Sequence, residues 1–198
     1  MKTTLIFATN NQHKVEEIEK VLNGYFTIIT LKEAGINIDI PEPYNTLHEN
    51  ARAKARTIFS ITHQNCFSED TGLEVEALNG EPGVKSARYA GSDRDFQANI
   101  SLLLHKLQHI EKRVAQFRTV ITLIYNNEEY YFEGICRGKI ISEQRGTNGF
   151  GYDPVFVPDG SNKTFAEMAL EEKNIFSHRK KATEKLIAFL SKQSTWKE

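Results

Sequence analysis

The stretch LIFATNNQHKVEEIEKVL, residues 5–22, decides the fold class of this chain. Its first four residues form an apolar run that is typical of a buried strand. The polar segment Thr9–Lys14 follows, and Val15, Ile18 and Val21 then recur at helical spacing. A strand, a polar loop and an amphipathic helix in this order predict an α/β fold.

Six further parts of the chain show strand or helix patterns. A helix beginning at Thr46 is supported by Glu49, because the two residues fit a capping box. The β-branched and aromatic residues around Asn126–Glu128 favour a long antiparallel hairpin, so we expect a mixed sheet. The predicted elements are a strand over Phe26–Leu31, a helix from Thr46 to about His63, a strand over Asn65–Ser68, a helix between Asp93 and Gln108, a hairpin from Val114 to Ile141 and a helix from Ser177 to about Lys192. In the helix between Asp93 and Gln108, we assign one face to the core: Phe96, Ile100, Leu103, Leu104 and Leu107.

The composition excludes several classes of protein. The 198 residues carry 25 Lys and Arg against 26 Asp and Glu, so a protein that coats nucleic acid by its net charge is excluded. Cys66 and Cys136 lie in no metal-binding pattern and form no disulfide framework, which favours a reducing compartment. The longest apolar stretches, such as Thr119–Tyr125, are too short to span a bilayer, and no secretory apolar region follows Lys2. We therefore expect a cytoplasmic protein that binds neither nucleic acid nor membrane.

The polar segment Thr9–Lys14 lies where the first strand passes into the first helix. Unpaired backbone N–H groups and the positive end of the helix dipole favour an anion at such a place. A cation in the first helical turn opposes the dipole by about 0.3 to 1 kcal/mol, so an anionic ligand would explain Lys14. A solvated lysine beside an Asn cap is the alternative.

An acidic pair, Glu69-Asp70, follows a predicted strand and precedes Gly72, which we expect to mark a turn. Carboxylate oxygens suit Mg²⁺, which usually takes one or two carboxylates plus substrate phosphates. Adjacent side chains of an extended strand point to opposite faces, so we assign the active role to Asp70, with Glu42 as a further candidate ligand. From these residues alone, an Asx turn in which Asp70 bonds the backbone remains an alternative.

The triplet Asp70-Thr71-Gly72 also matches the active-site triplet of aspartic proteases, which share one proton between two facing carboxylates. The chain contains no second such triplet. A peptidase would therefore need a symmetric dimer, and it would leave the other polar clusters unexplained.

Two later segments could complete a nucleotide site. The glycines of Gly146–Pro154 allow close backbone approach, and Phe150 and Tyr152 offer aromatic faces for a planar ring. A second segment combines Lys173 with Ser177–Arg179, a concentration of donors that can grip carbonyl or phosphate oxygens. An ordinary Gly-rich turn and a solvated charged face are the alternatives.

Taken together, these segments resemble the inosine triphosphate pyrophosphatase family, also called the Ham1 family, over almost the whole chain. The matching stretches are Ala8–Lys14, Glu49–Ala55, Glu69–Val75, Leu78–Val84, Ser86–Gly91, Gly149–Pro154, Leu170–Asn174 and Ser177–Arg179. Glu69 and Thr71 stand where the family more often has Asp and Ser.

The resemblance implies a two-lobed α/β fold, with an elongated mixed β-sheet flanked by helices and an active-site cleft between the lobes. Residues 1–198 would form one domain, and the protein would be a homodimer. The implied reaction is Mg²⁺-dependent hydrolysis of ITP, dITP or XTP to the monophosphate and pyrophosphate. A nucleotide-binding sensor without turnover is the alternative function.

The resemblance also assigns roles to individual residues. Glu42 and Asp70 would hold Mg²⁺, and Asp70 would also accept the proton of the attacking water. Thr71 would contact the substrate. The residues that would cradle the triphosphate are Thr9, Asn10, Asn11, Gln12, His13 and Lys14. The pocket would be completed by Phe150, Gly151, Tyr152, Asp153, Lys173, His178 and Arg179, with Phe150 stacked on the base and the His-Arg pair near its 6-oxo edge.

Overall fold

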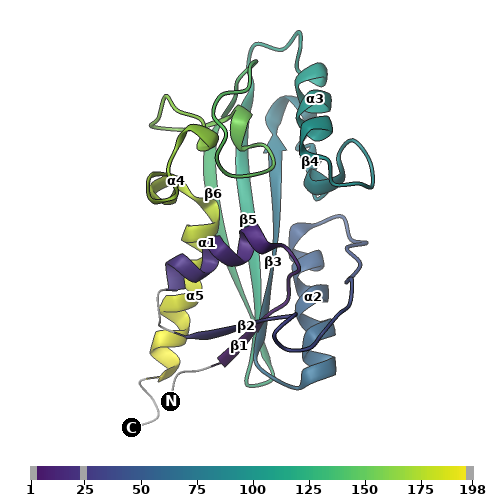
Figure 1. Ribbon diagram of the computed structural model, residues 1–198, viewed down its shortest axis with the longest axis vertical. Coiled ribbons are helices and arrows are strands. Elements are labelled where there is room, and N and C mark those ends of the chain that lie inside the picture. Colours follow the sequence, from purple (N-terminus) through teal and green to yellow (C-terminus); the bar gives the residue numbers. More distant parts are fainter. Residues whose placement is uncertain (1–3, 23–25, 195–198) are drawn as a thin grey trace. The chain divides into compact units, whose positions relative to one another are not determined.

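The opening segment folds as the sequence predicts, into a strand, a polar loop and a helix. The computed structural model describes residues 4–22 and 26–194, with strand β1 over Thr4–Phe7 and helix α1 over Gln12–Leu22 (Figure 1). β1 pairs in parallel with β2, Thr27–Thr30, and with β3, Cys66–Val75. The α/β prediction is confirmed.

The other predicted elements are present with shifted ends. The remaining helices are α2 (Leu47–Thr62), α3 (Phe96–Lys106), α4 (Leu170–Phe176) and α5 (His178–Ser194), and the remaining strands are β4 (Pro82–Gly83), β5 (Val114–Tyr125), β6 (Glu128–Ile140) and β7 (Phe156–Pro158). Short 3-10 helices cover Glu76–Leu78, Ser86–Arg88, Asp153–Val155 and Phe165–Glu167. None of the helices in the described ranges has the length and apolar character needed to span a lipid bilayer.

The sheet is mixed, as expected. Its strand order is β2-β1-β3-β5-β6-β7, with β4 paired to β3. The β1–β2 and β1–β3 pairs are parallel, whereas β4 and β7 run antiparallel to β3 and β6. Asn126 and Asn127, with φ of 52° and 68°, form the two-residue turn of the β5–β6 hairpin, and asparagine tolerates this left-handed backbone.

The chain divides into two compact units. Unit 1 comprises residues 1–70, 119–134 and 179–198, and unit 2 comprises residues 71–118 and 135–178, within the described ranges. β3 and the β5–β6 hairpin contribute residues to both units. That residues 1–198 form one domain stays a prediction, since both ends lie outside the described residues.

Unit 1 has apolar side chains on both faces of its strands, as expected for buried parallel strands. Leu5 and Phe7 of β1 pack in a cluster with α1 and α5, while Ile6 packs in a separate cluster with α2. This alternation follows the two-residue period of a strand. Helices α1 and α5 therefore cover one face of the unit 1 strands and α2 covers the other (Figure 1).

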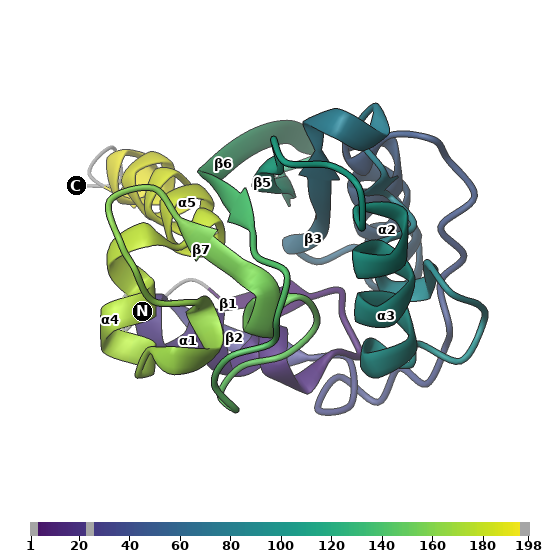
Figure 2. The same ribbon diagram turned by 90° about the horizontal axis from the view of Figure 1, so that it is seen from above.

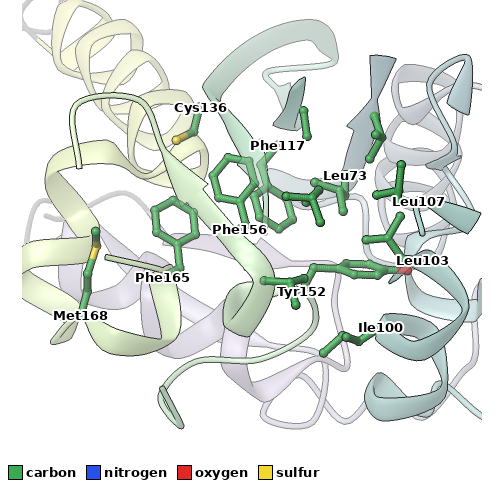
Figure 3. Close-up of a cluster of buried hydrophobic side chains, with 14 residues drawn as sticks. Leu73, Ile100, Leu103, Leu107, Phe117, Cys136, Tyr152, Phe156, Phe165 and Met168 are labelled. Atoms are coloured by element: carbon green, nitrogen blue, oxygen red, sulfur yellow. The ribbon is translucent and has the colours of Figure 1, made fainter. Parts of the chain in front are cut away.

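Unit 2 has its own core, built around aromatic residues. Phe117 of β5 lies with its ring centroid 4.7 Å from that of Phe156 of β7 and 6.0 Å from that of Phe165. Leu103 of α3 and Tyr152 belong to the same cluster (Figure 3). The antiparallel pairing of β7 with β6 brings Phe156 to this core (Figure 2).

Strand β3 is longer than predicted, because Gly72 does not mark a turn. A Cβ atom on Gly72 would lie 2.6 Å from the carbonyl oxygen of Gly83 in β4. The glycine therefore allows β4 to approach β3 closely, and the strand continues through it to Val75. The expectation of a turn at this position was wrong.

The caps explain where two helices begin. The Thr46 side chain accepts a hydrogen bond from the Glu49 N–H at 3.1 Å, as predicted. The Glu49 carboxylate accepts from the Thr46 hydroxyl at 2.7 Å and not from the Thr46 backbone N–H, so only the Thr46 half of the predicted capping box forms. In α3, the N-cap is Asp95, whose carboxylate accepts from the Ala98 N–H at 3.0 Å.

The predicted core face of α3 is confirmed in part. Ile100, Leu103 and Leu107 are at most 2% exposed, but Phe96 is 38% exposed. Phe96 is the first residue of α3, and it lies outside the unit 2 core.

Candidate active site

A buried network of four alternating charges lies in unit 1. Lys14 and Glu17 of α1, Glu69 of β3 and Arg179 of α5 form it. Arg179 Nε donates to both Glu69 oxygens, at 3.1 and 2.9 Å, and Lys14 Nζ lies 3.0 Å from Glu69 Oε1. The Arg179 guanidinium also donates to Glu17. Residues near both ends of the chain therefore meet at the acidic pair that the sequence singled out.

Within the network, the neighbouring opposite charges favour the ionised forms of Glu69 and Arg179. Glu69 is 1% exposed and Arg179 is 2% exposed. Burial raises the pKa of the Glu69 carboxyl, but the charges of Arg179 and Lys14 outweigh it and lower that pKa to about 2. Burial likewise opposes the Arg179 charge, yet Glu69 and Glu17 raise the pKa of its guanidinium above the ordinary value.

This pairing answers the question raised by Lys14 in the first turn of α1. The anion beside its ammonium in this structure is the Glu69 carboxylate. The neighbouring loop carries the cap that the alternative interpretation required, because Asn11 Oδ1 accepts the Lys14 N–H at 3.4 Å. Thr9 Oγ1 in turn accepts the Asn11 N–H at 3.2 Å, and Asn10 Nδ2 donates to the Ile38 carbonyl at 3.0 Å. Gln12 and His13 are exposed.

A second cluster of charges surrounds Asp70. The Lys54 ammonium of α2 lies 3.0 Å from Asp70 Oδ1 and also donates to Glu42 Oε1. Asp70 and Lys54 are each 7% exposed. The neighbours Glu69 and Asp70 thus use different partners, as expected for adjacent positions of an extended strand.

The pKa of the Asp70 carboxyl is raised. Burial is the main cause, and the Glu42 charge adds to it, while Lys54 and Lys14 pull in the opposite direction. Burial also opposes the charge on Lys54, but Asp70 and Glu42 outweigh it and raise the pKa of the ammonium. A carboxylate whose pKa moves towards neutral becomes a better proton acceptor.

Glu42 and Asp70 are the residues of unit 1 that could hold a metal ion. Among residues 4–22 and 26–194, no group of three Asp, Glu, His or Cys residues is placed to bind one. Two carboxylates that converge on a single cation nevertheless fit Mg²⁺, which takes one or two carboxylates and completes its shell with water and phosphate oxygens. Glu69 does not belong to this set, since both of its oxygens bind cations of the buried network.

Unit 2 brings together the predicted residues of the Gly-rich loop and Lys173. The Asp153 carboxylate accepts from the Phe150 N–H at 2.9 Å and from the Lys173 ammonium at 2.7 Å. Lys173 also lies 5.4 Å from the centroid of the Phe150 ring. Gly149 has a φ of +74°, and a Cβ there would lie 2.0 Å from Asp153 Oδ2, so the turn requires glycine. The loop is a fixed support for Phe150, whose ring is half-buried.

Tyr152 does not offer a ring face to a ligand, which corrects the expectation from its sequence. It is 3% exposed, packs in the unit 2 core and donates from its hydroxyl to the Ser86 carbonyl at 3.0 Å (Figure 3). His178 is 3% exposed and stacks on Phe117 with ring centroids 4.7 Å apart. Gly151 has a φ of +61°, and Thr71 is half-buried.

Two residues of the charged clusters were missed or undervalued in the sequence. From the sequence, Lys54 lies in the matching stretch Glu49–Ala55 but is assigned no role in the site, and Glu17 is not singled out. A signal for Lys54 exists, because it shares the buried face of α2 with Ala51, Ala55 and Ile58. Glu17 is likewise a charged residue on the buried side of α1, where it is 7% exposed and lies between Val15 and Ile18 in the sequence. A charge within an apolar stripe is unfavourable unless it is paired.

Fold and site together define an α/β protein in which buried carboxylates are paired with lysine and arginine. The cationic side chains are suited to a polyphosphate, and the carboxylates are suited to a divalent metal ion. The chain belongs to the Ham1 family, whose match covers residues 5–189.

Curated relatives match along most of their length. A dITP/XTP pyrophosphatase of Flavobacterium johnsoniae is 47% identical over 187 residues, which are 94% of this chain and 97% of the relative. A dITP/XTP pyrophosphatase of Porphyromonas gingivalis is 50% identical over 187 residues, which are 94% of this chain and 96% of the relative. Among solved structures, the Ham1 protein of Staphylococcus aureus has a TM-score of 0.88 at 38% identity, covering 96% of this chain and 100% of that one.

Proposed function

We propose that this protein is a nucleoside triphosphate pyrophosphohydrolase that converts ITP, dITP or XTP to the nucleoside monophosphate and pyrophosphate. The names of the relatives support the substrate class. The observation that carries the chemistry is the convergence of Asp70 and Glu42 on Lys54, in the unit that also holds Lys14 and Arg179. Removal of deaminated purine nucleotides from the nucleotide pool would be the physiological role.

The reaction needs a water molecule in line with the α-phosphorus, neutralisation of phosphate charge and an acceptor for the water proton. The water oxygen bonds to the α-phosphorus as the bond to the bridging oxygen of the β-phosphate breaks, so pyrophosphate leaves. Asp70 accepts the proton, a role that suits its raised pKa. Lys14 at the start of α1 neutralises oxygens of the phosphate tail.

Mg²⁺ is the cofactor of this proposal. When bound, it would polarise phosphate oxygens and stabilise the charge that develops on them. Glu42 and Asp70 would hold it, with the remaining positions taken by water and phosphate. The Lys54 ammonium holds the two carboxylates together in this structure.

Selection of the base belongs to residues of the C-terminal half of the chain. Phe150 would stack on the purine, and His178 and Arg179 would donate towards its 6-oxo group. An amino group at that position, as in adenine, would leave such buried donors without an acceptor and would be rejected. Gly151, Asp153 and Lys173 complete the proposed pocket, and Thr71 contacts the substrate near Asp70.

The wider setting of the enzyme is also part of this proposal. A homodimer with an active-site cleft between the lobes of each subunit follows from the resemblance of the sequence. A cytoplasmic location is supported by the two cysteines, Cys66 and Cys136, which are buried and are not joined in a disulfide. No role for nucleic acid or membrane is proposed.

One assay tests the proposed function directly. Pyrophosphate release is measured for ITP, XTP, dITP, ATP and GTP, with Mg²⁺ and with excess chelator. We expect release from the first three nucleotides, only with Mg²⁺, and little from ATP, whose base has an amino group at the 6-position. Guanine shares the 6-oxo group, so the rate with GTP reports selection at the 2-position of the purine. Saturable binding of ITP without release of pyrophosphate would instead identify a nucleotide sensor, and equal release from ATP would remove the proposed selectivity.

A further inference from the structure

Phe96 is an exposed aromatic residue that the fold of unit 2 leaves without a role. It belongs by spacing to the apolar face of α3, yet it is 38% exposed while Ile100 and Leu103 on that face are at most 2% exposed. The N-cap Asp95 fixes the start of the helix, so the position of Phe96 is set by the backbone. Large exposed apolar groups that do not serve a core are candidates for binding surfaces.

The ring of Phe96 lies beside Phe150. Their ring centroids are 6.2 Å apart and the two planes are tilted by 45°. Both residues belong to unit 2, Phe96 at the start of α3 and Phe150 in the Gly-rich loop. Two half-exposed rings at this tilt form an apolar corner, in which a planar ring can lie against one face and meet the other with its edge.

Polar contacts also hold the loop that carries Phe150. Its N–H donates to Asp153, and the Lys173 ammonium lies 5.4 Å from its ring centroid and 5.3 Å from that of Phe165. Lys173 is itself anchored by Asp153 at 2.7 Å. These contacts position the loop that carries the Phe150 ring, and Phe96 supplies an apolar surface beside that ring.

We propose that Phe96 is a further substrate-binding residue, which contacts the nucleobase beside Phe150. This inference rests on the proposed function, because Phe150 is the residue assigned there to base stacking. The contact is made by a ring surface, which recognises the π-face or edge of any purine and does not read its exocyclic groups. Phe96 therefore contributes to affinity for the base, and His178 and Arg179 keep the selection among bases.

The test compares ligands with and without a base. Steady-state kinetics are measured with ITP and XTP, and the affinities for IMP and for pyrophosphate are measured by calorimetry. In Phe96→Ala we expect KM and the IMP dissociation constant to rise about three- to ten-fold, the range expected for one aromatic contact. The rise should be equal for ITP and XTP, with kcat and pyrophosphate affinity unchanged.

Three further variants separate contact from support. Phe96→Tyr keeps the aromatic ring and should retain the wild-type KM. Phe96→Leu fills the space beside Phe150 but has no flat face, so its KM should be higher than that of the wild type. Ile175→Ala is the matched control, because Ile175 is an apolar residue of α4 in the same unit and is 70% exposed. It should change neither KM nor IMP affinity.

The inference is overturned if Phe96→Ala behaves like Ile175→Ala, if pyrophosphate affinity falls as much as IMP affinity, or if Phe96→Leu restores the wild-type KM. Phe150→Ala distinguishes this failure from a failure of the proposed function. If Phe150→Ala raises KM and Phe96→Ala does not, only the role of Phe96 is lost. If wild-type protein neither hydrolyses nor binds ITP, the proposed function is lost as well.

Discussion

At the scale of single residues, the adjacent carboxylates Glu69 and Asp70 show how neighbours in one strand acquire opposite properties. The pKa of Glu69 is lowered to about 2, because Arg179 and Lys14 outweigh its burial. The pKa of Asp70 is raised, because burial and Glu42 outweigh its two lysines. The first carboxylate is therefore suited to a permanent structural charge and the second to proton transfer.

Asp70→Asn should abolish most turnover and keep the fold. We expect kcat for ITP to fall about 10²- to 10⁴-fold, the usual loss of a general base, while ITP affinity changes little. Because the folded protein raises the pKa of Asp70, its ionised form is disfavoured there at neutral pH. The free energy of unfolding should then be equal or higher in the variant. Pyrophosphate release, calorimetry with ITP and urea unfolding measure the three quantities, and a near-wild-type rate would exclude Asp70 from the mechanism.

Glu69 makes an opposite prediction for stability. Its carboxyl has a lowered pKa in the folded protein, so its contribution is present above the unfolded value of 4.5 and is lost as the pH falls from there to about 2. A shift of this size corresponds to about 3 kcal/mol. At neutral pH, Glu69→Gln should lower the free energy of unfolding by that amount. The variant should also lack the part of the wild-type decrease in stability between pH 4.5 and about 2 that comes from protonation of Glu69. Urea unfolding across this pH range tests it, and parallel curves for the two proteins would contradict the assignment.

In the ion pairs that Glu17 makes with Arg179 and Lys54 makes with Asp70, sequence reasoning found one member and missed the other. Asp70, Lys14 and Arg179 stand in segments with a recognisable pattern, and the structure brings them into unit 1. Glu17 and Lys54 stand inside amphipathic helices, where the pattern gives no sign of which charge lies opposite. The identity of the partner charge depends on the tertiary structure, since it is set by which strand each helix covers.

At the scale of elements, sequence patterns placed helices α1, α2, α3 and α5 and strands β1, β2, β5 and β6, and they missed α4, β4 and β7. They also failed where the close approach of two backbones decides the outcome. Gly72 is compatible with a turn or with a close contact between strands, and only the position of Gly83 distinguishes them. The same limit applies to Phe96. Its spacing places it on the core face of α3, but the buried part of that face begins one turn later, at Ile100.

Substitution of Gly72 tests this explanation of the long strand β3. Intrinsic strand preference favours Val over Ala and Ala over Gly. The close approach of Gly83 predicts the reverse order, because a Cβ would lie 2.6 Å from its carbonyl oxygen. We expect Gly72→Ala to lower the free energy of unfolding by about 1 to 3 kcal/mol and Gly72→Val to lower it further. Urea unfolding ranks the three proteins, and a Val variant more stable than wild type would refute the contact.

At the scale of the whole molecule, unit 1 is closed by contacts between segments that are far apart in the chain. Arg179 bonds Glu17, 162 positions away, and Glu69, 110 positions away. The first and last helices of unit 1, α1 and α5, also pack in one apolar cluster with β1 and β3. A buried ion network does not by itself add stability, but breaking one leaves charges without compensation.

Arg179→Lys should therefore destabilise the protein even though it keeps the charge. A lysine ammonium cannot reproduce the paired contact of the guanidinium with Glu69 while also reaching Glu17. We expect the free energy of unfolding to fall by about 3 to 5 kcal/mol. The control is Lys180→Ala at the next position. The Lys180 ammonium lies 3.5 Å from a carboxylate oxygen of Glu184 at the surface, and loss of this pair should change stability by less than about 0.5 kcal/mol. Urea unfolding compares them, with Glu17→Gln as a milder break if Arg179→Lys does not fold. Equal stability of the Arg179 and Lys180 variants would mean that the apolar cluster alone joins the two helices.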